Sequence, residues 1–228
     1  MRLIDTTTLH LREFFDSQRP AYSILSHTWG SEEVNFQEWM EWEEGVPTQK
    51  ARVEAKSGFQ KIERACRVAR AHRHNYIWID TNCIDKKSSA ELSEAINSMF
   101  SWYQAASICF IHLEDFPSGA PIKSMSECRW FTRGWTLQEL LAPRHVVFFN
   151  AAWEPFGTKI NLCAEIHEIS AIDVFALSEL STIDDACVAQ KMSWASSRQH
   201  ARRTWLIACW DCSVSTCPYC MEKGTTHF

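Results

Sequence analysis

Short apolar runs alternate along this chain with amphipathic stretches, and this alternation limits the fold more than any other feature. The runs lie at the start of residues 21–30 (AYSILSHTWG), at residues 76–80 (YIWID), at 108–113 (ICFIHL) and at 145–150 (HVVFFN). Runs this short, rich in β-branched and aromatic residues, predict buried strands. Strands that alternate with helices need crossover connections, which favour a parallel sheet covered by helices. The alternation therefore predicts an α/β fold.

Two of the intervening segments carry strong helix signals. Residues 57–75 place apolar side chains on one helix face, at Phe59, Ile62, Cys66 and Ala69. Residues 88–107 open with a capping box formed by Ser88 and Glu91. Their apolar stripe consists of Leu92, Ile96, Met99, Phe100 and Tyr103.

The remaining segments are less regular. Residues 132–143 (TRGWTLQELLAP) predict a short helix that Pro143 must end. Amphipathic segments around 160–169 and 184–195 predict extra helices on the C-terminal side, closing over one side of the sheet. Residues 31–54 show no clean period and predict a mostly irregular connection. No linker interrupts the pattern, so one domain is expected from residue 1 to about Arg202.

Charge and hydropathy exclude several classes of partner. A net charge of −5 gives no electrostatic reason to expect nucleic acid or an anionic membrane surface as a partner. No apolar run approaches the roughly 20 residues that a membrane span needs, and the first 16 residues lack the apolar core of a secretory signal. We therefore expect a cytoplasmic protein whose ten cysteines are mostly reduced thiols.

Polar and aromatic residues follow the predicted strands, where an open parallel sheet binds its ligands. The first strand ends at Ser26, His27, Thr28 and Trp29. The second ends at Asp80, with Asn82, Cys83 and Asp85 just after it, and the third ends at Glu114 and Asp115. Taken singly, each residue has a structural explanation at least as good: Asp80 and Asp85 can cap turns, and His27 can be a satisfied loop histidine.

Several long blocks of the chain resemble a known family. The sequences YSILSHTWG, YIWIDTNCIDKKSSAELSEAINSMFSWYQAASICFIHLEDF, CRWFTRGWTLQELLAP and MSWASSR resemble, in order, the signature blocks of the fungal heterokaryon incompatibility (HET) domain. The resemblance runs from residue 1 to about Arg202. It implies an effector of non-self recognition that triggers the death of fused, incompatible cells. It also implies self-association or sensor-domain proteins as partners, with this chain a stand-alone or truncated effector.

HET domains in turn resemble TIR domains, which implies a flavodoxin-like, TIR-like parallel sheet flanked by helices. Some TIR domains cleave NAD through a glutamate in a Trp-x-x-x-Glu pattern, which Trp135 and Glu139 match here. The resemblance makes NAD a substrate rather than a cofactor and requires no metal. It makes Glu139 the catalytic carboxylate and Trp135 an aromatic wall beside it.

The same resemblance implies the binding residues. Ser26, His27 and Trp29 would face the mouth of the site, and Asp80 would contact a ribose hydroxyl. Arg129 and Arg133 would meet the pyrophosphate as bidentate donors.

Three other interpretations stay open. Glu139 can be a structural residue that pairs with Arg133 or Arg144, a contact worth roughly 0.2–1 kcal/mol where it is partly exposed. The effector can be a non-enzymatic assembly scaffold, as some TIR domains are. The gene can also be an inactive copy.

The tail carries an apparent metal motif, with cysteines at Cys209, Cys212, Cys217 and Cys220. Four residues between the two pairs is fewer than structural zinc sites usually have. Back-translated from Arg203 and shifted by one nucleotide, the tail can encode EDMAYCLLGLFSVNMPLLYGKRHNAF, which resembles the block that follows in HET proteins. We therefore interpret residues 203–228 as a frame-shifted, poorly ordered tail outside the family and expect no zinc site there.

Overall fold

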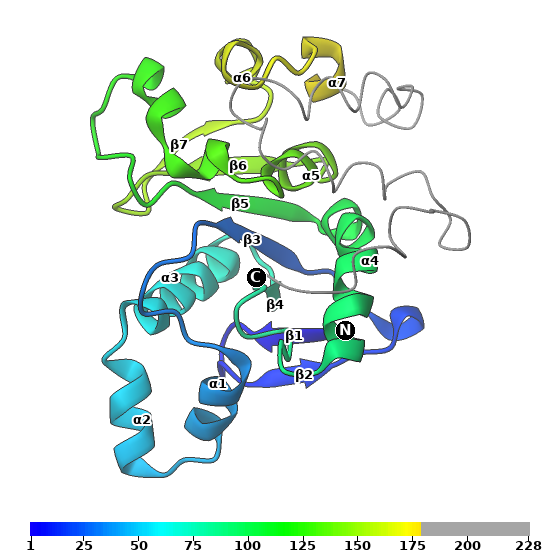
Figure 1. Ribbon diagram of the computed structural model, residues 1–228, viewed down its shortest axis with the longest axis vertical. Coiled ribbons are helices and arrows are strands. Elements are labelled where there is room, and N and C mark those ends of the chain that lie inside the picture. The colour runs from blue at the N-terminus through cyan, green and yellow to red at the C-terminus, as the bar shows by residue number, and fades with distance from the viewer. Residues whose placement is uncertain (179–228) are drawn as a thin grey trace.

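The chain folds around a seven-stranded sheet with helices on both faces, seen in a computed structural model in which residues 1–178 are described (Figure 1). The strands are β1 (Arg2–Asp5), β2 (Leu11–Glu13), β3 (Ser23–His27), β4 (Tyr76–Trp78), β5 (Ile108–His112), β6 (Val146–Phe149) and β7 (Pro155–Thr158). The α-helices are α1 (Phe36–Glu43), α2 (Pro47–Glu54), α3 (Ser57–Ala71), α4 (Ser89–Ala105), α5 (Thr136–Leu141), α6 (Cys163–Ser170) and α7 (Val174–Ser178). Short 3₁₀ helices are η1 (Asp16–Gln18), η2 (Ile122–Glu127) and η3 (Arg129–Thr132).

The strand order is β2-β1-β4-β3-β5-β6-β7. The four central strands, β4, β3, β5 and β6, are parallel, which confirms the predicted α/β fold. The edge strands differ from the expected parallel sheet, because β1 runs antiparallel to both β2 and β4, and β7 runs antiparallel to β6. Residues 6–10 and 150–154 are too few for a crossover, so the strands they join must be antiparallel. The narrower flavodoxin-like, TIR-like assignment stays a prediction.

The three helices predicted between central strands are confirmed, as α3, α4 and α5. In α3 the four predicted apolar residues are all buried. In α4 the Ser88 hydroxyl caps the Glu91 N–H at 3.4 Å, while the Glu91 carboxylate accepts from the Asp85 N–H at 2.8 Å instead of returning to Ser88. The predicted helix near 160–169 is α6. The one predicted at 184–195 and the tail from 203 lie outside the described residues.

The prediction that residues 31–54 are mostly irregular was wrong, because this segment contains α1 and α2. Asn35 and Glu38 form a complete capping box at the start of α1, and Pro47 occupies the first turn of α2. Trp39 and Trp42 are three residues apart and both buried. Each helix has only two turns, so the apolar period is too short to stand out in a longer window.

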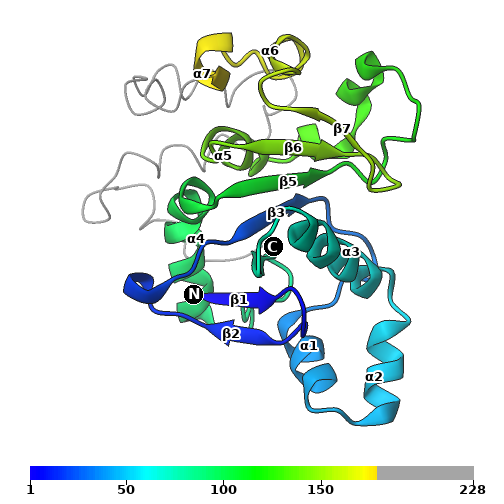
Figure 2. The ribbon, with the colours of Figure 1, turned by 180° about the vertical axis from the view of Figure 1, so that it is seen from behind.

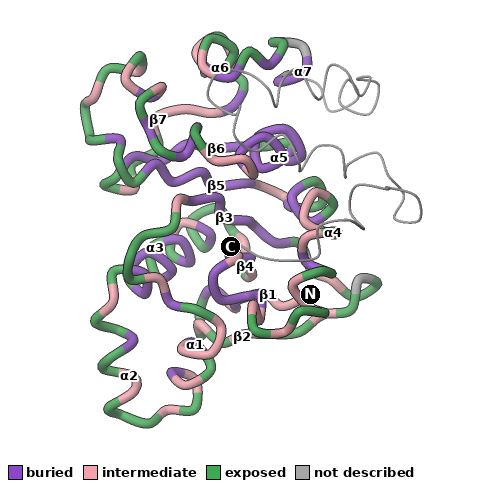
Figure 3. The backbone as a smooth tube through the Cα atoms, in the orientation of Figure 1, coloured by how far each residue is buried: buried purple, intermediate pink, exposed green. Residues whose placement is uncertain are grey.

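The helices form two layers. Figures 1 and 2 show α3 on one side of the sheet and α4 and α5 on the other. Most residues of the central strands are buried between these two layers (Figure 3). After β3 the chain enters the helix layer that contains α3, and after β5 it enters the opposite layer, which contains α5. The neighbouring strands β3 and β5 therefore connect to opposite faces of the sheet. In doubly wound sheets, ligands bind at the carboxyl ends of two such strands. Among the described helices, none is long and apolar enough to span a membrane.

Candidate functional site

A buried hydrogen-bonded group joins the end of β3 to α5. The Ser26 hydroxyl donates to Oε2 of Glu139 at 2.7 Å and accepts from Nε1–H of Trp130 at 2.7 Å. Thr136 donates to the Trp130 carbonyl at 2.6 Å and fixes the start of α5 beside this indole. All four side chains are buried. The short helix predicted from the sequence therefore holds Glu139 against the strand end, where the resemblance implied it would lie.

Arg133 supplies the positive charge next to this carboxylate. Its Nη1 lies 3.7 Å from Oε2 of Glu139 and also donates to the His27 carbonyl. Burial raises the pKa of Glu139 above its ordinary value near 4.5, although Arg133 and the Ser26 hydroxyl act to lower it. A buried carboxyl with a raised pKa at the end of a sheet is the kind of group that active sites use.

A second carboxylate follows β4. Asp80 binds the His27 imidazole through Oδ1 (3.1 Å to Nε2) and accepts from Nε1–H of Trp29 through Oδ2 at 2.9 Å. Burial acts to raise the pKa of Asp80, but the hydrogen bond to His27 and the nearby charges of Lys86 and Arg133 hold it well below its usual range. Asp80 is therefore ionised in any physiological buffer.

Several buried polar atoms around these groups have no hydrogen-bond partner among the described residues. They are Nδ1 of His27, Oγ1 of Thr81, both amide atoms of Asn82 and both ring nitrogens of His112. His27 and His112 are register partners at the ends of β3 and β5. Buried polar atoms are normally satisfied, so this concentration at the strand ends indicates a place where bound molecules complete the hydrogen bonding.

The structure thus brings together six of the eight predicted site residues: Ser26, His27, Trp29, Asp80, Arg133 and Glu139. Trp135 is the N-cap residue of α5; its carbonyl accepts from the Glu139 N–H at 3.2 Å, and its side chain is half-buried. Arg129 is exposed and pairs with Asp115 at 3.3 Å and Glu114 at 3.7 Å.

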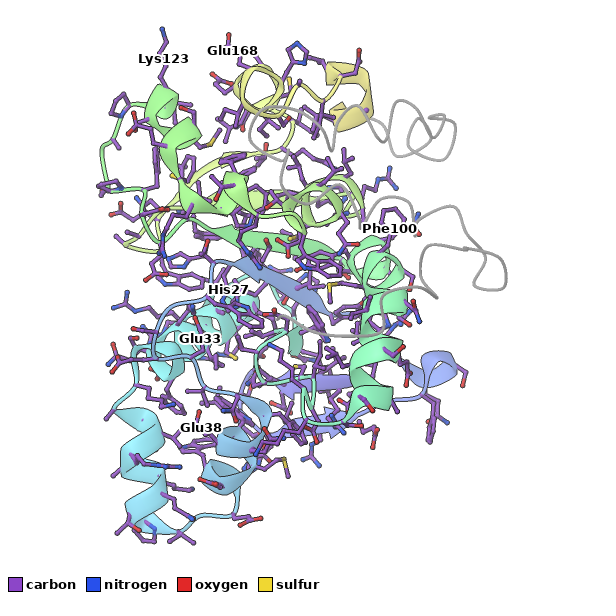
Figure 4. All side chains as sticks on the ribbon, in the orientation of Figure 1. His27, Glu33, Glu38, Phe100, Lys123 and Glu168 are labelled. Atoms are coloured by element: carbon purple, nitrogen blue, oxygen red, sulfur yellow. The ribbon has the colours of Figure 1, made fainter. Side chains whose placement is uncertain are left out.

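Sequence reasoning missed several groups near the site. Lys86 lies over the Trp29 ring, and Lys61 pairs with Glu33 and donates to the Thr28 carbonyl at 3.3 Å. Figure 4 shows His27 and Glu33 in the same part of the molecule. Lys86 follows the predicted Asp80–Asp85 cluster directly, which is a usable signal, whereas nothing in the sequence singles out Lys61.

Metal and thiol chemistry find no support here. No group of three or more potential ligands among His, Cys, Asp and Glu comes together within the described part of the chain. Burial raises the pKa of Cys83 to about 12, and its Sγ accepts the Ile79 N–H at 3.4 Å, so this thiol is not an activated nucleophile. Two hollows of about 310 Å³ open elsewhere, one between η2 and α6 and one beside the start of α4.

Comparison with known proteins gives two matches. The family model described as "Heterokaryon incompatibility protein (HET)" matches residues 22–118, which include Ser26, His27, Trp29 and Asp80. Over 193 residues the chain is 38% identical to "Vegetative incompatibility protein HET-E-1" of Podospora anserina. The match covers 80% of this chain but only 14% of that relative's length. No solved structure matches.

Proposed function

Because this chain carries a heterokaryon incompatibility (HET) domain, we propose that it is an effector of vegetative incompatibility and kills fused cells by cleaving NAD at the nicotinamide–ribose bond. The reaction is a hydrolysis. The N-glycosidic bond breaks, nicotinamide leaves with the bonding electron pair, and water adds to the ribose carbon. The products are nicotinamide, ADP-ribose and a proton.

The observation that carries this proposal is the position of Glu139. It lies at the carboxyl end of β3, 2.7 Å from the Ser26 hydroxyl, and its pKa is raised by burial. Cleavage of an N-ribosyl bond builds positive charge on the ribose, as in glycosidases. A carboxylate at that point stabilises the charge and accepts the proton of the attacking water.

Two neighbours support the same chemistry. Asp80 is ionised and lies in the same cluster, so it adds negative potential where the cationic transition state forms. The Arg133 guanidinium can receive a phosphate oxygen, since it is partly exposed, with 21% of its side chain accessible.

The burial of Glu139 favours a second candidate function, that of an assembly scaffold. Only 6% of the Glu139 side chain is accessible, and its partners Ser26 and Arg133 are internal contacts that hold α5 against β3. In that role the carboxylate positions a helix, and the effector signals by bringing domains together without chemistry.

The test is an assay of NAD consumption by the 228-residue chain over a range of protein concentrations, with the release of nicotinamide as the measured signal. Glu139→Gln keeps the size of the side chain and removes its charge, and should abolish the activity. Glu63→Gln is the matched control, because Glu63 is an exposed carboxylate on α3, 3.7 Å from Arg67. A folded wild-type protein that leaves NAD intact even when concentrated would reject the enzyme and favour the scaffold.

A further inference from the structure

Trp29 is an exposed aromatic side chain held by a partly buried carboxylate, that of Asp80. The residue is 46% exposed, yet its Nε1–H donates to Asp80 at 2.9 Å. The other oxygen of Asp80 is held by the imidazole of His27, which is only 2% exposed. Fixing the indole in this way costs conformational freedom. The ring is therefore presented at the ligand-binding end of the sheet in a defined orientation.

One face of this indole already holds a cation. Nζ of Lys86 lies 3.4 Å from the ring centroid, within the range of a cation–π contact. Within residues 1–178, Lys86 forms no hydrogen bond and no ion pair within 4 Å. Burial lowers the pKa of Lys86, opposed by the negative charges of Asp80 and Glu33. The ammonium is thus partly desolvated, and its attraction to the indole and to the neighbouring carboxylates offsets the free-energy cost of that desolvation.

We propose that the Trp29 face covered by Lys86 is a binding site for planar organic cations, and that Lys86 is a tethered competitor for it. A flat cationic ring stacks on indole over a larger area than an ammonium does, and it keeps the attraction to the ring quadrupole. The ionised Asp80 at the edge of the indole adds attraction that a neutral ring does not gain. Binding requires the flexible Lys86 side chain to leave the ring.

This site would give the enzyme a preference for oxidised NAD, an extension that rests on the proposed function. The nicotinamide of oxidised NAD is a planar pyridinium cation, whereas the ring of the reduced form is neutral. The nicotinamide released by hydrolysis is also neutral. The indole would therefore hold the substrate ring and release the product ring, while Lys86 returns to cover the face.

The test is calorimetric titration of the 228-residue chain with 1-methylnicotinamide, a planar cation that cannot be hydrolysed as NAD is. Neutral nicotinamide is the comparison ligand. We expect the cation to bind about threefold to tenfold more tightly than nicotinamide. Lys86→Met should strengthen binding of the cation by a similar factor, because it removes the competitor. Lys87→Met is the matched control, because it removes the same charge at the next residue, which is exposed. It should change the affinity for the cation less than Lys86→Met does.

The gain of affinity in Lys86→Met cannot result from misfolding, which makes it the decisive result. Trp29→Leu should abolish binding. Equal binding of the cation and of neutral nicotinamide, or equal effects of Lys86→Met and Lys87→Met, would overturn the inference. Cation binding without NAD hydrolysis would reject the proposed enzyme and leave this site standing.

Discussion

The Ser26 hydroxyl and the Glu139 carboxylate meet at 2.7 Å across 113 residues of sequence, and they join the central strand β3 to the short helix α5. Ser26 serves two partners at once, since it also accepts from the Trp130 indole at 2.7 Å. One small hydroxyl therefore satisfies a buried carboxylate and a buried N–H. Removing it would leave both buried groups with one hydrogen-bond partner fewer.

Ser26→Ala should lower the free energy of unfolding by about 2–3 kcal/mol, because burying an unsatisfied donor costs more than a hydrogen bond itself contributes. Ser23→Ala on the same strand is the control. Ser23 makes one hydrogen bond, 3.3 Å to the Tyr76 carbonyl, and its loss should cost about 0.5–1.5 kcal/mol. Urea unfolding measures both values. Equal losses in the two variants would contradict the double role of Ser26.

Glu139→Gln should change how stability depends on pH. The pKa of Glu139 is raised in the folded protein, so the unfolded chain loses this proton first as the pH rises. The carboxyl therefore contributes stability below its ordinary pKa near 4.5, and that contribution disappears as the pH passes through the raised pKa. The stability of the wild type relative to Glu139→Gln should fall as the pH rises from the ordinary pKa near 4.5 through the raised pKa of the folded protein. Urea unfolding at several pH values measures this difference.

The same comparison with Glu63→Gln provides the control, since Glu63 is exposed and about half accessible. Parallel stability curves for the wild type and Glu139→Gln would show that Glu139 titrates as it does in the unfolded chain. That result would also remove the electrostatic argument for placing catalysis there.

The parts of the fold that were predictable depend on local patterns. The helix α3 was recognisable because Phe59, Ile62, Cys66 and Ala69 repeat on one face over about three turns. The two-turn helix α1 was missed because only Trp39 and Trp42 mark it. The antiparallel edges were missed because short strands such as β2 carry little periodic signal, and pairing direction depends on connection length.

Some residues of the candidate site were also predictable from local sequence, and others were not. Ser26, His27, Trp29 and Asp80 follow from a rule about strand ends, and the structure places them together. Glu139 required a family resemblance, because a carboxylate in a short helix has no distinctive pattern. Lys86 was missed because its partner Trp29 lies 57 residues away, and such a contact is set by how loops pack rather than by local sequence.

His112→Phe should remove a pH dependence of stability. Burial, with the nearby charges of His27 and Lys61, lowers the pKa of His112 to about 3. The folded protein thus keeps this ring neutral while the unfolded chain binds a proton below its ordinary pKa of 6.5. Stability should therefore fall as the pH drops from 6.5 toward 3, by about 1.4 kcal/mol per pH unit from this residue.

The His112→Phe variant should lack this dependence of stability on pH, and near neutral pH its free energy of unfolding should stay close to that of the wild type. Within residues 1–178 neither ring nitrogen of His112 makes a hydrogen bond of normal geometry, and the polar neighbour of the ring there is the Ala151 backbone, so an apolar ring of similar shape should lose little. It can also retain the stacking on Trp153, whose ring centroid is 4.1 Å away at an interplanar angle of 13°. Chemical denaturation of both proteins between pH 3 and pH 6.5 measures this dependence. A His112→Phe variant with the same dependence as the wild type would refute the role assigned to His112.

Gly58→Ala should destabilise the protein although alanine favours helices by about 1 kcal/mol over glycine. Gly58 lies in the first turn of α3, and an added Cβ would come within 2.5 Å of the Glu32 carbonyl oxygen and 2.8 Å of Cα of Glu33. Both are backbone atoms, so the loop would have to move away from α3. That shift would pull Glu33 from its ion pair with Lys61 beside the strand ends.

The matched control is Gly30→Ala, where the nearest atom to the added Cβ is a flexible carboxylate oxygen of Glu33 at 3.7 Å, an ordinary contact. We expect Gly58→Ala to lose about 1–3 kcal/mol, as overpacked sites do, and Gly30→Ala to change stability by less than about 0.5 kcal/mol. Thermal and urea unfolding of both variants provide the comparison. A Gly58→Ala protein as stable as the wild type would mean that the loop at residues 32–34 is free to move off α3, and that Glu33 does not anchor the site.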